Sequence, residues 1–162
     1  MAISIRAATS ADLPLIAALI RELAEYERLS DEVRFDEAVL GEKLFGPRPY
    51  AEVLIGETDG VAAGFALFFH NFSTFEGLPG VYLEDLFVRQ EARGGGLGKA
   101  LLIDLARIAL ERGCARLEWS VLDWNAPSIG FYRKLGARLM DEWTIMRVDG
   151  EALQALGNSG NG

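Results

Sequence analysis

One short stretch constrains the fold of this chain more than any other: residues 93–99 read Arg-Gly-Gly-Gly-Leu-Gly-Lys. It follows Val81–Val88, an apolar run typical of a strand, and precedes Lys99–Arg112, whose apolar spacing predicts a helix ended by Gly113. Amides at the start of a helix attract anions, and glycines allow a close approach to the backbone. The strand–loop–helix unit therefore predicts a site for a phosphate-bearing ligand.

The two common nucleotide-binding loops do not match this stretch. The mononucleotide pattern G-x-x-x-x-G-K-[ST] requires a glycine and a hydroxyl where the chain has Arg93 and Ala100. The dinucleotide pattern G-x-G-x-x-G, begun at Gly94 or Gly96, lacks its last glycine. A nucleotide-binding protein is therefore the weakest of the functions considered.

The composition narrows the class of partner. The 162 residues are half apolar and carry a net charge of −8, so nucleic acid is not an expected partner; Arg89, Arg93 and Lys99 are a local basic exception. The acidic surface serves either solubility or the attraction of a cation. We expect no membrane partner, because no apolar run is long enough and no signal-peptide pattern is seen. The single cysteine, Cys114, fits a reducing compartment and predicts a cytoplasmic protein.

The remaining pattern predicts a mixed α/β fold, with one layer of sheet and helices packed against it. Asp59-Gly60 predicts a tight hairpin turn. The expected strands are Ile3–Arg6, Glu52–Glu57, Val61–Phe69, Val81–Val88, Arg116–Leu122 and Trp143–Val148. The expected helices run from Thr9 or Ser10 past Leu23, over Glu37–Leu44, over Lys99–Arg112 and from Pro127 to Lys134. We expect one domain over residues 1–150 and a flexible tail over 151–162.

Several motifs carry a resemblance to a known family. Arg93-x-x-Gly96-x-Gly98 matches the [QR]-x-x-G-x-[GA] pattern of the GNAT superfamily of N-acetyltransferases. Three longer stretches resemble its diamine (spermidine/spermine) branch: residues 21–27, 82–88 and 124–137. The resemblance covers most of residues 3–150. It implies a mostly antiparallel central sheet flanked by helices, acetyl-CoA as cosubstrate, no metal, and a homodimer.

The resemblance also implies a coenzyme site built largely from the main chain. The strand residues Leu86, Phe87 and Val88 would offer backbone groups to the pantetheine arm. The loop residues Arg93, Gly94, Gly95, Gly96, Leu97, Gly98 and Lys99 would hold the pyrophosphate, with Asn125 and Ser128 as further contacts.

The catalytic residues follow from the same likeness. Tyr132 would protonate the departing thiolate, and Glu84 would receive the proton of the amine. The alternatives are a Tyr132 ring that packs beside Phe131 and an outward-facing Glu84, since strict alternation sends Glu84 and Asp85 to opposite faces. The expected acceptor contacts are Tyr26, Glu27, Glu84, Asp85 and Glu118.

The function expected is acetyl transfer to a primary amine on a small cationic molecule, such as a diamine, a polyamine, thialysine or a lysine-like amino acid. A carboxylate beside the acceptor suits this chemistry, because it binds the cation and then takes its proton. Two alternatives remain open at this stage. One is acetylation of a protein N-terminus or lysine, and the other is a non-catalytic module that binds acyl-CoA.

Overall fold

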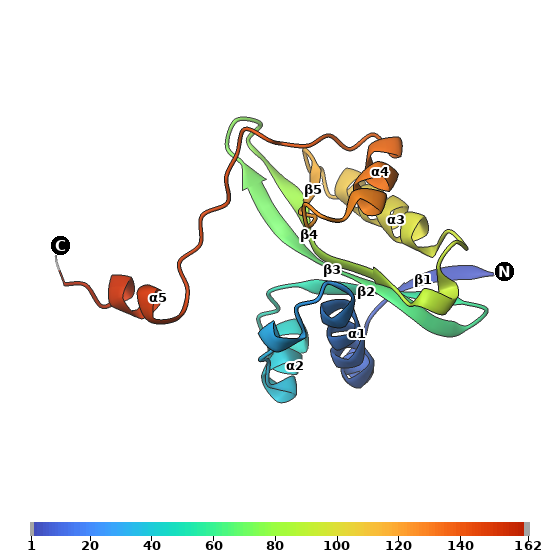
Figure 1. The fold of residues 1–162 in the computed structure, drawn as a ribbon, viewed down its shortest axis with the longest axis horizontal. Coiled ribbons are helices and arrows are strands. Elements are labelled where there is room, and N and C mark those ends of the chain that lie inside the picture. Colours follow the sequence, from blue (N-terminus) through green and yellow to red (C-terminus); the bar gives the residue numbers. More distant parts are fainter. Residues whose placement is uncertain (1, 161–162) are drawn as a thin grey trace. The chain divides into compact units, whose positions relative to one another are not determined.

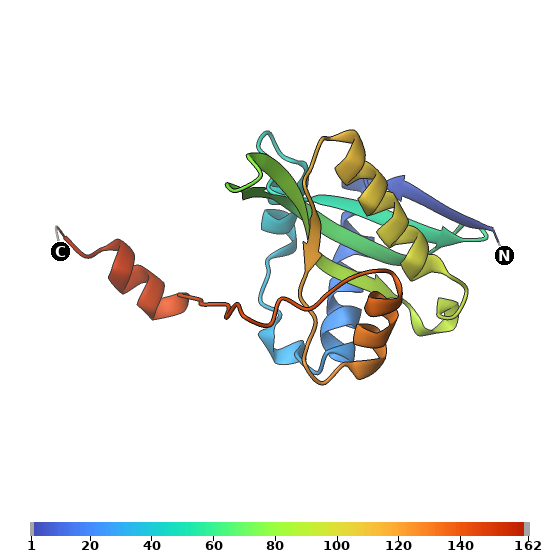
Figure 2. The same ribbon diagram turned by 90° about the horizontal axis from the view of Figure 1, so that it is seen from above.

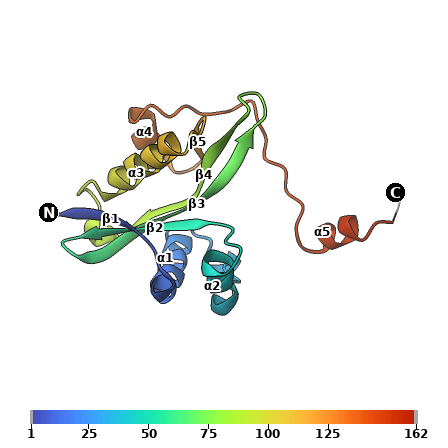
Figure 3. The ribbon, with the colours of Figure 1, turned by 180° about the vertical axis from the view of Figure 1, so that it is seen from behind.

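The computed structural model describes residues 2–160, which divide between Leu122 and Asp123 into two compact units that are described separately. The first unit holds one sheet of five strands in the order β1-β2-β3-β4-β5. Neighbouring strands are antiparallel except for the parallel pair β4 and β5, which confirms the predicted mixed, mostly antiparallel sheet (Figures 1 and 3). The strands are β1 (Ile3–Ala7), β2 (Glu52–Thr58), β3 (Val61–Ser73), β4 (Leu78–Val88) and β5 (Leu117–Trp119).

Helices cover both faces of this sheet. The helices α1 (Leu13–Tyr26) and α2 (Glu37–Phe45) lie on one face and α3 (Leu97–Glu111) on the other (Figure 1). Seen from above, α3 runs over the sheet, where it contacts every strand (Figure 2). Short 3-10 turns occur at η1 (Ser10–Asp12), η2 (Ser30–Glu32) and η3 (Gln90–Ala92).

Apolar side chains between the sheet and α1 form the main core. Ile16 and Leu19 of α1 are fully buried against Ile55 and Phe65 of the sheet, with Phe87 of β4 nearly so. Burial of a side chain of this size contributes about 1.5–3 kcal/mol. This core places the last turn of α1 beside the second half of β4, and Tyr26 contacts Phe87 with ring centroids 6.5 Å apart.

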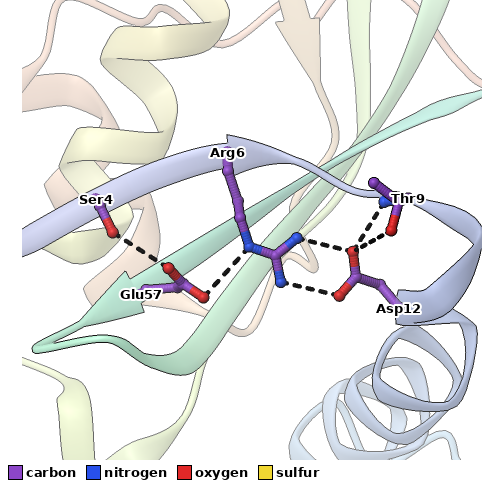
Figure 4. Close-up of polar contacts among 5 residues, drawn as sticks. All are labelled: Ser4, Arg6, Thr9, Asp12 and Glu57. Carbon is purple, nitrogen blue, oxygen red and sulfur yellow. Dashed lines mark hydrogen bonds and ion pairs between the residues drawn. The ribbon is translucent and has the colours of Figure 1, made fainter.

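A polar network fixes the start of α1 to the sheet (Figure 4). The Arg6 guanidinium donates two hydrogen bonds to Asp12, at 2.8 and 2.9 Å, and a third to Glu57 at 3.3 Å. The Thr9 N–H donates to the same Asp12 carboxylate at 2.8 Å. The hydrogen bonds from Arg6 lower the pKa of Asp12 to about 2. Three elements, β1, β2 and the start of α1, therefore meet at one guanidinium.

Most predicted elements of the first unit are present, with different bounds. The Asp59-Gly60 turn is confirmed, and both residues have a positive φ, of 52° and 79°. Strands β3 and β4 are longer than predicted, because their pairing continues past Phe69 to Ser73 and Leu78. The polar residues around Phe72 hid the alternating pattern of this stretch in the sequence. β5 is shorter than predicted, since only residues 117–119 pair with β4.

The second unit contains two helices, α4 (Ala126–Lys134) and α5 (Gly150–Gly157). The predicted helix from Pro127 is confirmed as α4, and Gly136 follows it with a φ of 101°. The predicted strand at Trp143–Val148 is wrong: among residues 2–160 the sheet ends at β5, and an extended segment becomes a strand only when a neighbour accepts its hydrogen bonds. α5 occupies part of the segment predicted as a tail, and residues 161–162 lie outside the described chain.

Candidate active site

The second half of β4 has one open edge in the described sheet. β5 pairs only with Val81–Leu83, whereas β3 continues beside β4 as far as Val88. The N–H of the next residue, Arg89, donates to Ala63 of β3 at 2.7 Å. Because backbone groups alternate in direction along a strand, Leu86 and Val88 turn their main-chain groups toward the open edge. Two of the three strand residues that the sequence analysis expected at the coenzyme, Leu86 and Val88, lie on this edge, whereas Phe87 turns its backbone groups toward Phe65 of β3.

A β-bulge marks the point where this open edge begins. Leu67 of β3 pairs with Asp85 and the next residue, Phe68, pairs with Leu83, so Glu84 is an extra residue on β4. A bulge interrupts the alternation of side chains and bends the strand. The strict alternation that predicted opposite faces for Glu84 and Asp85 therefore does not hold here.

Three carboxylates from two elements act on one another around the bulge. Partial burial, followed by the charges of Glu84 and Glu27, raises the pKa of Asp85 to about 7. Burial and the charge of Glu84 also raise the pKa of Glu27. We call Glu27, Glu84 and Asp85 the acidic cluster. Its members repel one another, so a bound cation would relieve the repulsion.

The chain places Glu27 by a specific ending of α1. The Leu29 N–H donates to the Ala24 carbonyl at 2.8 Å, and the Arg28 N–H donates to Glu25 at 3.1 Å. This is the Schellman arrangement, in which the residue after the C-cap adopts a left-handed conformation. Arg28 does so with a φ of 63°, although a non-glycine residue there costs about 1–2 kcal/mol. The turn fixes Glu27 as the C-cap residue facing β4.

In the glycine loop between η3 and α3, two residues have a left-handed backbone conformation and the space beside the backbone is largely free of other atoms. Gly94 and Gly96 have φ values of 86° and 91°, which side chains disfavour. A Cβ built at Gly94 would meet no atom within 4 Å, and one at Gly98 would meet only Val88, at 3.7 Å. The loop residues therefore leave space for a ligand to approach the backbone.

The amides of this loop lie ahead of the helical ladder of α3. Gly96 is the N-cap, and its carbonyl accepts the bond from the Ala100 N–H at 2.9 Å. The N–H groups of Leu97, Gly98 and Lys99 precede this bond, and such first-turn amides have no partner within a helix. Such amides and the helix dipole favour an anion, and the phosphate site expected from the sequence stays a prediction.

The basic residues near the loop have different surroundings. Arg89 donates to the Glu22 carboxylate at 3.0 and 2.9 Å, so it ties β4 to α1. Arg93 donates through Nε to the Val88 carbonyl at 2.8 Å, and its guanidinium lies over the Tyr26 ring, 4.7 Å from the centroid. The Lys99 side chain is exposed on the first turn of α3. Lys99 is therefore better placed than Arg89 to meet a bound anion.

Glu118 of β5 is engaged by its own partners. Its Oε1 accepts hydrogen bonds from Arg116 Nε and from Asn71 Nδ2, each at 2.9 Å. These bonds fix the Glu118 carboxylate between Asn71 of β3 and Arg116, the residue before β5. The predicted contact of Glu118 with the acceptor stays a prediction.

The predicted residues of the second unit all belong to α4 or its cap. The Asn125 side chain accepts a hydrogen bond from the Ser128 N–H at 3.4 Å and so caps the helix. Tyr132 lies in the last turns, with its ring centroid 5.5 Å from that of Phe131. The coenzyme and catalytic roles of these residues stay predictions.

Two features of the site were missed from the sequence. One is the bulge at Glu84, for which the paired carboxylates in an otherwise apolar strand were a signal. The other is the stacking of Arg93 on Tyr26, which joins residues far apart in the sequence and left no local pattern. Among residues 2–160, no group of three or more His, Cys, Asp or Glu side chains is close enough to hold a metal ion, and none of the helices has the length and apolar content that a membrane crossing requires.

Comparison with known proteins now identifies the family. The sequence profile of the Acetyltransferase (GNAT) family matches residues 16–137. The chain belongs to this family. The GNAT chain is 39% identical to the thialysine N-epsilon-acetyltransferase of Bos taurus, over 95% of its own length and 96% of that protein. It is 34% identical to the L-ornithine N5-acetyltransferase NATA1 of Arabidopsis thaliana, over 94% of the chain and 86% of that protein.

A solved structure supports the same assignment. An integron cassette protein from the mobile metagenome of V. cholerae superposes on this GNAT chain with a TM-score of 0.81 and 28% identity, covering 98% of the chain and 99% of that protein. The GNAT fold predicted from the sequence is therefore confirmed, as is the likeness to the diamine acetyltransferase branch of the family. The protein is an N-acetyltransferase.

Proposed function

We propose that this enzyme transfers the acetyl group of acetyl-CoA to one primary amine of a small acceptor that carries a second positive charge, such as a diamino acid or a polyamine. The observation that carries the proposal is the acidic cluster at the open half of β4, immediately before the glycine loop in the chain. Relatives named for acetylation of thialysine and ornithine support this acceptor class.

The residues around the open edge fit a thioester coenzyme. Leu86 and the N–H of Val88 present backbone groups for an extended pantetheine arm, while the Val88 carbonyl accepts from Arg93, and the amides of Leu97 and Gly98 suit a pyrophosphate. Gly94 leaves room beside them. When bound, acetyl-CoA would supply the activated acetyl group, so no nucleophile from the protein is required.

The acidic cluster fits a cationic amine. A primary amine has a pKa near 10.4, so its neutral form at pH 7 costs about 4.6 kcal/mol. Glu84, the exposed member, binds the ammonium and receives its proton, directly or through water, as the nitrogen attacks. Glu27 and Asp85 hold the second positive charge. That charge in turn favours the ionised form of Asp85.

The leaving coenzyme A thiolate also requires a proton. As the C–N bond forms and the C–S bond breaks, the Tyr132 hydroxyl donates its proton to the sulfur. This role is carried over from the family likeness of residues 124–137, as are the coenzyme contacts of Asn125 and Ser128. We also propose a homodimer, on the same likeness, and a location in the cytoplasm, on the single cysteine Cys114.

A panel of acceptors tests the proposal. Release of coenzyme A thiol would be followed with thialysine, ornithine, spermidine, butylamine and a lysine-containing peptide. We expect kcat/KM for the best doubly charged acceptor to exceed that for butylamine at least tenfold, because butylamine leaves part of the acidic cluster unpaired. Binding of acetyl-CoA without turnover on any amine would show a binding module, and preference for the peptide would show a protein acetyltransferase.

A further inference from the structure

We propose that the Arg93 side chain is a positioning element that couples the coenzyme site to the acceptor site, rather than a ligand of the pyrophosphate. The inference rests on the proposed function, and it assigns to Arg93 a role different from the one expected from the sequence. It makes the affinity for coenzyme and the affinity for amine depend on each other.

The contacts of Arg93 on the coenzyme side involve both its main chain and its side chain. Its N–H donates to the Gln90 carbonyl at 3.2 Å and closes η3. Its Nε donates to the Val88 carbonyl at 2.8 Å, on the open edge of β4. Neither group is therefore directed at a phosphate. The two bonds hold residues 88–93 in a compact turn that ends immediately before Gly94.

The contacts on the acceptor side involve the guanidinium, whose central carbon lies near two aromatic rings. It lies 4.7 Å from the centroid of the Tyr26 ring and 5.6 Å from that of Phe87. Tyr26 is the last residue of α1, and its neighbour Glu27 belongs to the acidic cluster. One exposed side chain thus spans from the start of the glycine loop to the end of α1.

Arginine is suited to this position by its shape. A guanidinium is planar, donates hydrogen bonds from its nitrogens and carries a delocalised charge that an aromatic ring attracts, so the hydrogen bond to Val88 and the contact with Tyr26 form together. A lysine ammonium has no plane and makes one of these contacts only at the expense of the other. A ligand that orders the loop therefore also orders Arg93, Tyr26 and Glu27, and by thermodynamic reciprocity the amine strengthens coenzyme binding.

The experiment measures that coupling in a complex that does not react. Affinity for coenzyme A would be measured by calorimetry without and with saturating thialysine. In the wild type we expect thialysine to tighten coenzyme A binding about fivefold. In Arg93→Met the gain should fall below twofold, while the affinity for coenzyme A alone changes less than twofold. Arg93→Lys keeps the charge and should not restore the gain.

Two further variants separate coupling from a general loss of structure. Tyr26→Leu should lose the gain as Arg93→Met does, and the double variant should lose no more than either one, because both remove the same contact. Arg107→Met removes an exposed arginine paired with Asp104 on α3 and should behave as the wild type. Thermal unfolding of each variant checks that it is folded. If Arg93→Met does not fold, Tyr26→Leu decides the question.

Several results would overturn the proposal. If Arg93→Met weakens the binding of coenzyme A alone tenfold and leaves the gain intact, the Arg93 side chain is a phosphate ligand and the proposal is wrong. A gain that survives in folded Tyr26→Leu, or one that Arg93→Lys restores in full, also contradicts it. A wild type that binds coenzyme A and turns over thialysine without any gain refutes the coupling alone. A wild type that does not bind coenzyme A refutes the proposed function, and the coupling with it.

Discussion

The glycine loop and two members of the acidic cluster, Glu84 and Asp85, lie on consecutive parts of one chain segment, and we propose that they recognise their ligands in opposite ways. The loop offers main-chain N–H groups made accessible by Gly94, Gly96 and Gly98. The acidic cluster offers the side chains of Glu84 and Asp85, brought together by a bulge. On the proposed function, the difference means that coenzyme binding depends on the space around the backbone, whereas acceptor choice depends on charge. Substitutions in the two regions should therefore change different kinetic constants.

The largest effect should come from a residue that belongs to neither region. Tyr132→Phe removes only the hydroxyl that we propose protonates the thiolate, so kcat should fall about 1,000-fold with the affinity for coenzyme A nearly unchanged. Steady-state kinetics and calorimetry check the two halves of this prediction. If turnover survives, the comparison between the two binding regions holds but Tyr132 only packs against Phe131.

Glu84→Gln should be next in size. The amide keeps the shape of the side chain but does not accept the proton of the amine, so kcat should fall about 100-fold. Because the glycine loop is untouched, the KM for acetyl-CoA should stay within twofold of the wild type. The measurement is a pair of saturation curves, one for each substrate. An equal rise of both KM values would mean that the two regions are not separate.

Gly98→Val tests the loop from the other direction. The valine side chain would project into the open space beside Val88, so the affinity for coenzyme A should fall about 30-fold through hindered contact with the first-turn amides. Gly98→Ala is the matched control, because its single methyl makes an ordinary contact there and should cost less than threefold. Calorimetry with coenzyme A measures both. Equal effects of the two substitutions would remove the loop from the site.

Asp85→Asn should give a smaller effect whose size depends on pH. With its pKa raised to about 7, Asp85 is mostly neutral in the free enzyme at pH 6 and mostly charged at pH 8. The KM for thialysine should therefore rise about fivefold over the wild type at pH 8 and less than twofold at pH 6. A ratio that does not change with pH contradicts the assignment.

The same substitution also tests the energetics of the acidic cluster. A carboxyl whose pKa is raised on folding binds more protons in the folded than in the unfolded state, so its contribution to stability falls as pH rises from about 4 to above 7. Asp85→Asn should therefore stabilise the folded state relative to the wild type by about 1–3 kcal/mol more at pH 8 than at pH 4. Urea unfolding of the free enzyme at the two pH values measures this difference.

The smallest effect is expected at Glu118. Its carboxylate already accepts hydrogen bonds from Arg116 and Asn71, so Glu118→Gln should raise the KM for thialysine no more than twofold. A tenfold rise would extend the acidic cluster to β5. Kinetics at pH 8, in parallel with Asp85→Asn, make the two carboxylates directly comparable.

Local signals explain how much of the structure was predictable. Gly94–Gly98 and the apolar spacing of α3 predicted the loop and its helix, because the backbone freedom of glycine and the helical periodicity both depend only on residues close together in the sequence. Asp59-Gly60 predicted its turn for the same reason. The predicted strand at Trp143–Val148 failed because its alternation says nothing about whether a neighbouring strand is present.

The candidate site shows the same division. Its residue types followed from motifs, but the proximity of Glu27 to Asp85 depends on how α1 packs on the sheet. The bulge at Glu84 depends on the register between β3 and β4, which no short motif specifies. Stacking of Arg93 on Tyr26 joins residues 67 positions apart, so only the folded chain reveals it.

The way α1 is held has a consequence for how acceptor size could change between related enzymes. Its first turn is tied by Arg6 and Asp12, and its second half meets β4 through the Arg89–Glu22 ion pair and the aromatic contact of Tyr26. A helix of 14 residues is about 21 Å long, so a tilt of about 3° at the tied end moves the far end by about 1 Å. A modest repacking of the core could therefore move the end of α1 by about the length of one methylene group of the substrate. The size of the acceptor could change in this way without the substitution of any carboxylate.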